Sequence, residues 1–184
     1  MTSGISRGQK FYLDTNVVIA AVEDDSAAGR AIWASLQRGA KMGRNFRDPI
    51  ERFVTSELTL AECLVKPLRD GDEELASVYA MLLVNNDLVA MESVHQDALW
   101  IAAYLRGQHT ALKLPDAIHI ATAFCCGCSF FLTGDTRLHK DYWARPLDAL
   151  GRPIAGEHDR RLQGMHPEAF GEELGKLEPY DSDE

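Results

Sequence analysis

Short apolar runs alternate with segments of helical periodicity through most of this chain. Four of these runs have the length and the bounding polar residues of buried strands, and they span residues 11–13, 53–54, 88–91 and 129–133. A chain that places helices between successive strands returns to the same sheet by crossover connections, so its strands lie parallel and its helices cover both faces. The alternation therefore predicts an α/β fold with a parallel central sheet.

Capping residues indicate where the helices between these strands begin and end. The signals for a beginning are a Ser, an Asp-x-x-Glu or Ser-x-x-Gln pair, or a Pro in the first turn. They stand at Ser26, Ser56, Asp70, Ser93 and Pro115. The expected stops are Gly39, Pro67, Gly107 and Gly127. Gly favours the C-terminal cap, and Pro ends or kinks a helix that contains it. A weaker helix is expected at residues 168–177.

The alternating pattern fades after about Trp143, which suggests a boundary. At 184 residues the chain has the size of one complete domain. We expect residues 1–145 to form that domain and residues 146–184 to form an acidic C-terminal extension. Residues 157–184 carry nine acidic and three basic side chains, so most of the net charge of −9 lies there and the body is only mildly acidic.

The N-terminal residues and the cysteines bear on where the protein works. Residues 1–10 lack the apolar stretch of a secretion signal, and no apolar run approaches the ~18 residues that suggest a membrane span. We therefore expect a soluble, cytoplasmic protein that does not enter a membrane. Three of the four cysteines crowd into residues 125–128, without the second C-x₂₋₄-C pair of a structural zinc site. Reduced, buried thiols are the favoured interpretation.

Four acidic residues occupy similar places in the predicted fold. Asp14 and Asp135 directly follow apolar strands. Asp116 stands at the start of a helix, and Glu62 lies about two turns into the helix after the second strand. The carboxyl ends of parallel strands, and the loops after them, line one rim of an open α/β sheet. We therefore expect acids that are distant in the sequence to meet at this rim.

A cluster of carboxylates calls for a cation, because two like charges ~4 Å apart repel by ~4 kcal/mol at an effective dielectric near 20. Oxygen ligands suit Mg²⁺ or Mn²⁺, which can polarise a phosphodiester and help to generate hydroxide from water. Taken singly, each acid also has an ordinary interpretation as a strand end, a helix N-terminus, a solvated helix residue or a turn former. This ordinary interpretation fits Asp14 and Glu62 least well, because both lie within apolar segments, where a charged side chain needs a compensating partner.

The residues around these acids resemble the motifs of the PIN-domain family, and most of all its VapC-like toxins. The matching segments are residues 11–17 (FYLDTNV), 55–64 (TSELTLAECL), 114–123 (LPDAIHIATA) and 131–135 (FLTGD). Each is short, but the four in the family's order form a specific signal. The resemblance implies a three-layer α/β/α sandwich and Mg²⁺- or Mn²⁺-dependent cleavage of RNA phosphodiester bonds. It also implies a homodimer and, for a toxin, an antitoxin protein as partner.

The resemblance also implies roles for individual residues. Carried over by motif, the metal-binding and catalytic acids are Asp14, Glu62, Asp116 and Asp135. Asn16 and Thr133 are expected to orient these acids or bound waters through hydrogen bonds. His119 follows Asp116 by three residues on the same helical face. Because hard cations prefer oxygen ligands, a packed or solvated histidine is favoured over a metal ligand at this position.

Two other functions fit parts of the pattern. A phosphatase of the haloacid-dehalogenase kind also places an Asp after its first strand, but its chemistry expects a second Asp where this chain has Asn16. A catalytically silent PIN fold, used as an interaction or scaffold domain, would be expected to lose acids that this chain keeps. The leading interpretation is a divalent-metal-dependent endoribonuclease, with the toxin of a toxin–antitoxin pair as one form of it.

A basic segment within this acidic chain is the candidate RNA-binding segment. Residues 38–52 hold five basic and two acidic side chains, a local balance of +3. Such charges neutralise phosphate backbones and make binding depend on salt. Arg44 and Arg47 are the expected contacts, and a solvated loop with ordinary surface charge is an equal alternative.

Overall fold

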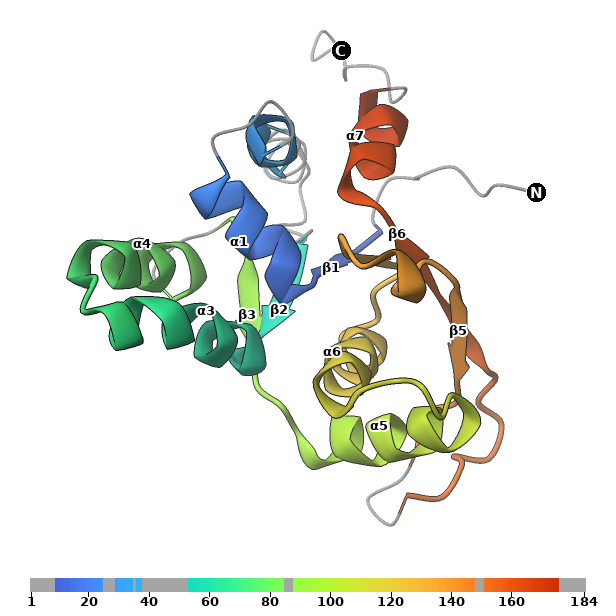
Figure 1. Ribbon diagram of the computed structural model, residues 1–184. Helices are drawn as coiled ribbons and strands as arrows, with labels where there is room; N and C mark the ends of the chain where they lie inside the picture. Colours follow the sequence, from blue (N-terminus) through green and yellow to red (C-terminus); the bar gives the residue numbers. More distant parts are fainter. Residues whose placement is uncertain are drawn as a thin grey trace, which may run out of the picture.

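Six strands form one sheet in the order β3-β2-β1-β4-β6-β5 (Figure 1) in the computed structural model, which describes residues 9–24, 29–34, 36–37, 53–84, 88–147 and 151–175. The strands are β1 (Phe11–Leu13), β2 (Phe53–Ser56), β3 (Ala90–Glu92), β4 (Phe130–Leu132), β5 (Asp141–Ala144) and β6 (Arg160–Met165). Neighbouring strands are parallel except for β5 and β6, which are antiparallel. The prediction of an α/β fold with a mostly parallel central sheet is confirmed.

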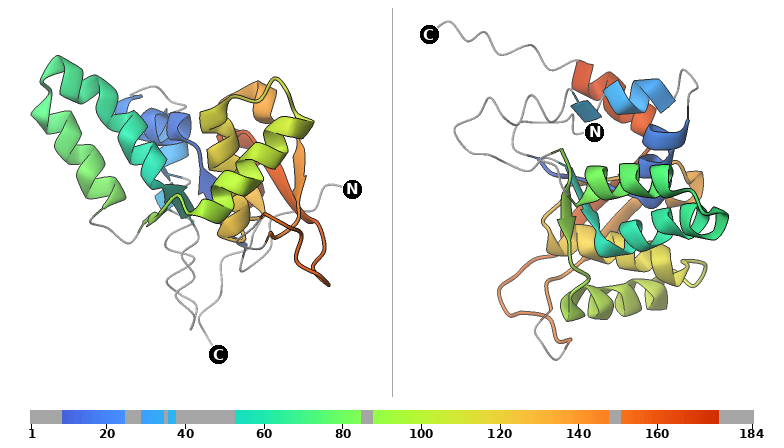
Figure 2. Two further views of the ribbon diagram at one scale, coloured as in Figure 1. Left: turned by 90° about the horizontal axis from the view of Figure 1, so that it is seen from below. Right: turned by 90° about the vertical axis from the view of Figure 1, so that its left-hand side faces the viewer.

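Helices cover both faces of this sheet. They are α1 (Thr15–Glu23), α3 (Glu57–Asp70), α4 (Glu73–Leu83), α5 (Gln96–Gln108), α6 (Leu114–Cys125), α7 (Pro167–Gly175) and the short 3-10 helix η1 (Thr136–Leu138). Residues 29–34 and 36–37 are helical as well. The helices α1, α3 and α4 lie on one side of the sheet and α5 and α6 on the other, as the views in Figures 1 and 2 show. The result is a three-layer α/β/α sandwich.

The side chains of β1 divide the core into two halves. Phe11 and Leu13 belong to the half that α1, α3 and α4 cover, where Phe11 stacks on Phe130 with ring centroids 5.3 Å apart. Tyr12 belongs to the half that α5 and α6 cover. Successive strand residues face opposite sides of a sheet, and both sides are buried here, so β1 is apolar at every position. This packing fixes the end of the strand at the point where Asp14 follows.

Several helix boundaries differ from the sequence prediction. Pro67 does not end α3, which continues through it to Asp70 and is capped by Gly71 at a φ of 71°. Pro removes one backbone donor, but Pro67 is buried and only three helical residues follow it, so little of the hydrogen-bond ladder is lost. Asp72, rather than Asp70, caps α4, because its carboxylate accepts a hydrogen bond from the backbone N–H of Leu75 at 2.9 Å. Helix α5 likewise runs one residue past Gly107.

The sequence patterns missed α1, β5 and β6. Strand β6 lies between β4 and β5, although it comes from the segment interpreted as an extension. Leu162 is its one large apolar side chain that is fully buried, so the strand leaves almost no periodic signal. Position 164 is buried and requires glycine, because a Cβ there would lie 2.0 Å from the carbonyl oxygen of Leu138. This close approach joins β6 tightly to the segment that links η1 and β5.

Some predictions fall outside the described residues. The helix expected from Ser26 to Gly39 is described only at residues 29–34 and 36–37, where it is helical. The basic segment 38–52, with Arg44 and Arg47, lies wholly outside the described ranges. The helix expected at residues 168–177 is present as α7 up to Gly175. None of the helices in the described part of the chain has the length and apolar character to cross a membrane.

Candidate active site

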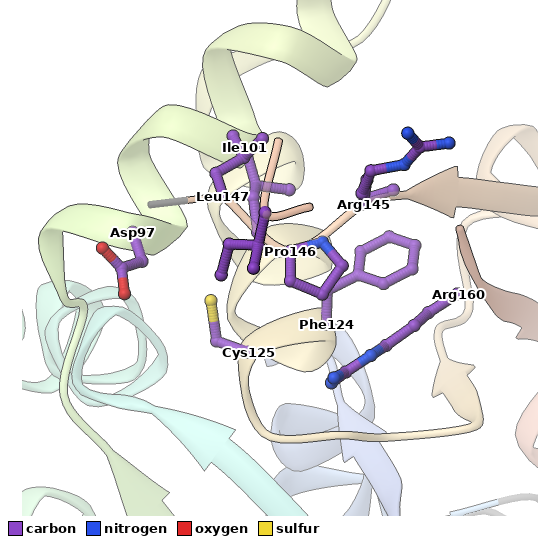
Figure 3. Close-up of a pocket in the computed structure, with 10 residues that line it drawn as sticks. Asp97, Ile101, Phe124, Cys125, Arg145, Pro146, Leu147 and Arg160 are labelled. Atoms are coloured by element: carbon purple, nitrogen blue, oxygen red, sulfur yellow. The ribbon is translucent and has the colours of Figure 1, made fainter. Parts of the chain in front are cut away.

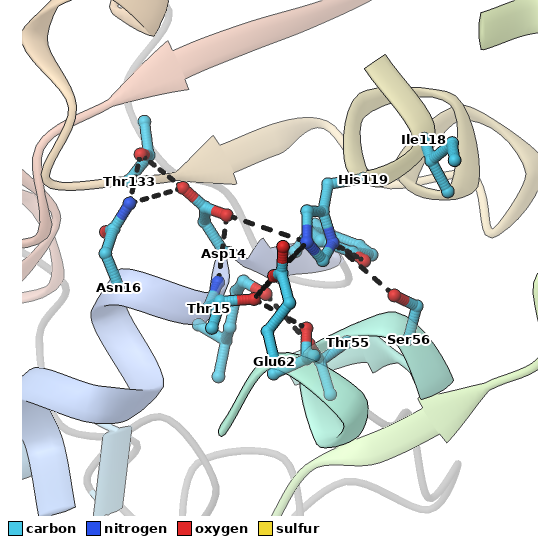
Figure 4. A network of polar contacts seen from close by, with 12 residues as sticks. Asp14, Thr15, Asn16, Thr55, Ser56, Glu62, Ile118, His119 and Thr133 are labelled. Carbon is cyan, nitrogen blue, oxygen red and sulfur yellow. Dashed lines mark hydrogen bonds and ion pairs between the residues drawn. The ribbon is translucent and has the colours of Figure 1, made fainter. Parts of the chain in front are cut away.

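The polar side chains at the carboxyl end of β1 form a connected network (Figure 4). Asp14 is the N-cap of α1, and its Oδ1 accepts a hydrogen bond from the backbone N–H of Thr15 at 2.9 Å. Its Oδ2 accepts hydrogen bonds from Thr133 Oγ1 at 2.6 Å and from Asn16 Nδ2 at 2.5 Å. Only 7% of the Asp14 surface is exposed. Three donors therefore compensate a carboxylate whose burial would otherwise be costly.

Asn16 ties the turn after β1 to the turn after β4. Its Oδ1 accepts a hydrogen bond from the backbone N–H of Gly134 at 2.6 Å, and its Nδ2 donates to Asp14 and Thr133. A Cβ at position 134 would lie 3.2 Å from Asn16 Oδ1, so this close contact favours Gly. Thr133 Oγ1 also accepts a hydrogen bond from the backbone N–H of Asp135 at 3.1 Å. The structure thus places Asn16 and Thr133 in direct contact with Asp14.

Glu62 reaches the same network from α3. Its Oε2 lies 3.0 Å from His119 Nε2 and also accepts a short hydrogen bond from Thr15 Oγ1. The hydrogen bond from His119, followed by that from Thr15, holds the pKa of Glu62 below its usual range although the side chain is partly buried. The carboxylate is thereby kept ionised, and its Oε1 takes part in neither of these two bonds.

His119 links Glu62 to the central strand of the sheet. It is fully buried on α6, and its Nδ1 lies 2.8 Å from the hydroxyl oxygen of Tyr12. A carboxylate can only accept hydrogen bonds, so His119 Nε2 donates to Glu62. Burial raises the pKa of Tyr12, so the phenol hydroxyl that Nδ1 contacts keeps its proton. His119 is therefore a packed histidine, as the sequence favoured, and it also fixes Glu62, which the sequence did not predict.

Asp116 stands in the first turn of α6. Burial, together with the negative charges of Asp14 and Asp135, raises the pKa of this carboxyl, and the nearby Lys113 offsets the shift only in part. Its carboxylate has no hydrogen-bond partner among the described residues. A cation beside Asp14 and Asp116 would relieve both the desolvation and the repulsion.

Asp135 differs from the other acids because it already has a cation. Its Oδ1 accepts hydrogen bonds from the backbone N–H of Arg137 at 3.0 Å and from Arg137 Nε at 2.9 Å. The pairing with this guanidinium lowers the pKa of Asp135 to about 2. The structure therefore joins Asp14 and Glu62 in one network, brings Asp116 within range of their charge, and leaves Asp135 in a salt bridge at the margin.

The four acids do not form a closed metal cage. Within the described ranges, no three His, Cys, Asp or Glu side chains converge closely enough to hold one ion by themselves. Mg²⁺ usually keeps several waters and binds through one or two carboxylates together with substrate phosphates. Asp14 and Asp116, two oxygen donors whose charges interact, fit that open mode of binding. The four cysteines are free thiols.

Comparison with known protein families identifies the family of this chain. The model of the PIN domain family matches residues 11–142. The chain belongs to the PIN domain family. The matched region holds all four predicted acids together with Asn16 and Thr133, and it ends within β5. Strand β6 therefore lies beyond the matched part of this PIN domain, although it completes the sheet.

Several solved structures resemble this PIN domain at low sequence identity. VapBC2 from Rickettsia felis, solved bound to a DNA fragment from its promoter, is 12% identical with a TM-score of 0.55, and the match covers 71% of this chain and 91% of that one. VapC20 from Mycobacterium tuberculosis, a toxin that cleaves the sarcin-ricin loop, is 20% identical with a TM-score of 0.49, covering 68% and 92%. FitAcB from Neisseria gonorrhoeae is 20% identical with a TM-score of 0.45, covering 68% and 88%. No curated protein matches the chain in sequence.

Proposed function

We propose that this PIN domain is a divalent-metal-dependent endoribonuclease that cleaves RNA phosphodiester bonds. The observation that carries the proposal is Asp116, a partly buried carboxyl with a raised pKa and no hydrogen-bond partner among the described residues, close to the buried carboxylate of Asp14. Groups perturbed in this way by burial and by like charge are candidates for a functional site. One divalent cation would satisfy both acids.

Asp14, Glu62 and Asp116 are the residues that would hold Mg²⁺ or Mn²⁺, with Asp135 at the margin; because no three of them converge on one point, bound waters and an RNA phosphate would complete the coordination. A bound ion of this kind polarises the phosphodiester and helps to generate hydroxide from water at neutral pH. The acids supply oxygen ligands of the type that these ions prefer. Asp135 would join them after its guanidinium partner turned to another acceptor.

The surrounding side chains hold two of these acids in place before any substrate arrives. Asn16 and Thr133 fix the Oδ2 of Asp14. His119, which Tyr12 orients from the core, fixes the Oε2 of Glu62. Because these donors are packed, the carboxylates need little reorganisation when an ion and an RNA strand bind.

The test is turnover of a fluorescently labelled RNA by the wild-type protein with Mg²⁺, with Mn²⁺ and after EDTA treatment. We expect cleavage with either ion, loss of cleavage in EDTA, and recovery when Mn²⁺ is added in excess. Cleavage that EDTA leaves unchanged would contradict metal dependence. No cleavage under any of these conditions would favour the catalytically silent interaction or scaffold domain. A DNA strand of the same sequence measures the preference for RNA.

The resemblance of the four motifs to VapC-like toxins extends the proposal to a toxin–antitoxin pair. In that case the partner is a small antitoxin protein that binds this chain and blocks cleavage. A reading frame for such a protein immediately upstream of the gene would support the pairing. Co-purification of its product with this chain, together with inhibition of RNA cleavage, tests the pairing directly.

We also propose that the protein forms a homodimer through the hairpin of α3 and α4. The two helices expose large apolar side chains at Val65, Leu68, Val78 and Met81, and Val84, the C-cap of α4, is exposed beside them. Single exposed apolar residues are ordinary, whereas several on two adjoining helices indicate an interaction surface. Light scattering at micromolar concentration should give the mass of a dimer, and replacing Leu68 and Met81 with Glu should give that of a monomer. A monomer mass for the wild type contradicts the proposal.

A further inference from the structure

A pocket adjoins the candidate active site on the side of Asp116. It has a volume of about 360 Å³, and its walls are the turn of residues 108–112 and the segment from Arg137 to Lys140, with Asp116 at its edge. The pocket thus shares Asp116 with the candidate active site. It is a different pocket from the one in Figure 3, which lies at the far end of α6 against Phe124 and Cys125.

The charges around this pocket favour an anion, although the whole chain is acidic. The ammonium of Lys140 lies 5.3 Å from the ring centroid of Tyr142 and makes no ion pair with a described carboxylate. Arg137 binds Asp135 through Nε and Nη2, and its exposed side chain keeps Nη1 for another acceptor. Lys113 is close enough to act on the pKa of Asp116. Three cations therefore surround two acids in this corner.

The segment that carries two of these cations is held firmly by β6. The backbone N–H of Gly164 donates to the carbonyl oxygen of Lys140 at 2.9 Å, and the missing Cβ of Gly164 lets the Leu138 carbonyl approach. The backbone N–H of Leu138 also donates to the carbonyl oxygen of Asp135 at 2.9 Å. Lys140 therefore projects from ordered backbone, so little further backbone entropy is lost when its side chain binds an anion.

We propose that this pocket binds a backbone phosphate of the RNA strand beside the scissile phosphodiester, with Lys140 as its principal cation and Arg137 as the second. The inference rests on the proposed ribonuclease function, and it specifies the path of the RNA strand next to the acidic residues. An RNA strand fits because it carries an anionic group at every nucleotide, so one phosphate can face Asp116 through the divalent ion while its neighbour contacts Lys140. Phosphate contacts of this kind position the strand without reading its sequence.

The test measures binding of a fluorescein-labelled single-stranded RNA by anisotropy over a range of salt concentrations in Mg²⁺. An Asp14→Asn background keeps the strand intact. Lys140→Ala should weaken binding and lower the salt slope by about 0.7, the value for one phosphate contact of a single strand. Lys140→Arg should restore most of the slope. The matched control is Arg160→Ala, which removes one positive charge from the start of β6, beside the pocket that Cys125 lines at the opposite end of α6 from Asp116.

Three results would overturn the inference. In the first, Lys140→Ala keeps the affinity and the salt slope of its parent. In the second, Arg160→Ala lowers the slope as much as Lys140→Ala does. In the third, a poly-glutamate peptide at the same charge concentration displaces the RNA, and Lys140→Ala abolishes this competition. That result would identify a surface for acidic peptides. Thermal melting of each variant shows that the fold is retained. The wild-type cleavage assay is separate, so cleavage without a Lys140 effect removes this inference and leaves the proposed function standing.

Discussion

The two halves of the candidate site balance their negative charges in different ways. In the Asp14 half, which comprises Asp14 and Glu62, hydrogen-bond donors from the backbone, hydroxyls, an amide and an imidazole satisfy the carboxylates. In the Asp116 half, which comprises Asp116 and Asp135, one carboxylate has no hydrogen-bond partner among the described residues and the other is bound by Arg137. Packed hydrogen-bond donors therefore stabilise both carboxylates of the Asp14 half. In the Asp116 half one carboxylate is paired with a guanidinium, and the other has no partner among the described residues.

This difference indicates which part of the site is prepared before binding and which part responds to it. Donors from α1, the turn after β4 and α6 hold the carboxylate oxygens of the Asp14 half in place. The Asp116 half gains most from an added cation, because the pKa of Asp116 is already raised by burial and by like charge. We therefore expect mutations in the Asp14 half to impair catalysis through lost geometry, and mutations in the Asp116 half to change stability and ion affinity together.

The largest expected effect is that of Asp14→Asn on RNA cleavage. We expect kcat to fall by about 100-fold or more, the scale on which losing one preorganised charge-stabilising group acts. Circular dichroism should show an intact fold, because the two side chains have the same shape. The matched control is Asp141→Asn, which removes an exposed acid of β5 that pairs with Arg161. Cleavage by Asp14→Asn at the rate of the control would show that the Asp14 half is structural.

The next effect in size is that of His119, which acts through Glu62. Partners that orient a metal ligand change affinity or activity by about 10–100-fold, so His119→Leu should weaken both Mn²⁺ binding and kcat within that range. His119→Gln places an amide donor near the position of Nε2 and should recover much of the loss. Equal losses in the two variants would mean that the packing of the ring matters and that its hydrogen bond to Glu62 does not.

The smallest effects separate Asp116 from Asp135 in the metal-free protein. The pKa of Asp116 is raised on folding, so the free energy of unfolding falls as the pH rises from the unfolded-state pKa to the folded-state pKa. Asp116→Asn should therefore raise the Tm only at pH values above this range. The pKa of Asp135 is lowered to about 2, so its contribution is present above its unfolded pKa and is lost as the pH falls through about 2. Asp135→Asn should therefore lower the Tm slightly at neutral pH, as expected for an exposed ion pair.

Thermal melts in EDTA across the acidic and neutral range measure both variants. We expect Tm changes of opposite sign at neutral pH, with the change for Asp116→Asn vanishing at acidic pH. Changes of the same sign would remove the electrostatic distinction between the two acids.

The sequence predicted the parts of the fold whose side chains are buried on both faces of the sheet. Strands β1 and β4 are apolar at every position, and the acids that follow them mark the rim, so Asp14 and Asp135 could be placed from the sequence. Strand β6 could not be placed, because Leu162 is its one large, fully buried apolar residue and its position depends on the contact of Gly164 with Leu138. Such a contact joins residues distant in sequence and leaves no periodic signal.

The site shows the same limit at the level of single side chains. The positions of Asp14, Asp116 and Asp135 could be inferred from strand ends and a helix start, whereas Glu62 lies within α3. The hydrogen bond from His119 to Glu62 joins residues 57 positions apart, and the only hint was that His119 shares a helical face with Asp116. The pairing of Asp135 with Arg137 is local, yet a basic residue two positions after an acid is too common in turns to predict an ion pair.

Titration calorimetry with Mn²⁺ tests the central claim, that acids from both halves form one metal site. The account predicts that the wild-type protein binds Mn²⁺ and that Asp14→Asn and Asp116→Asn each weaken the binding. In the double variant the loss of binding free energy should be smaller than the sum of the two single losses, because both residues act on one ion. Asp141→Asn should bind as the wild type does. Wild-type affinity in both single variants, or two losses that add fully, would contradict the account.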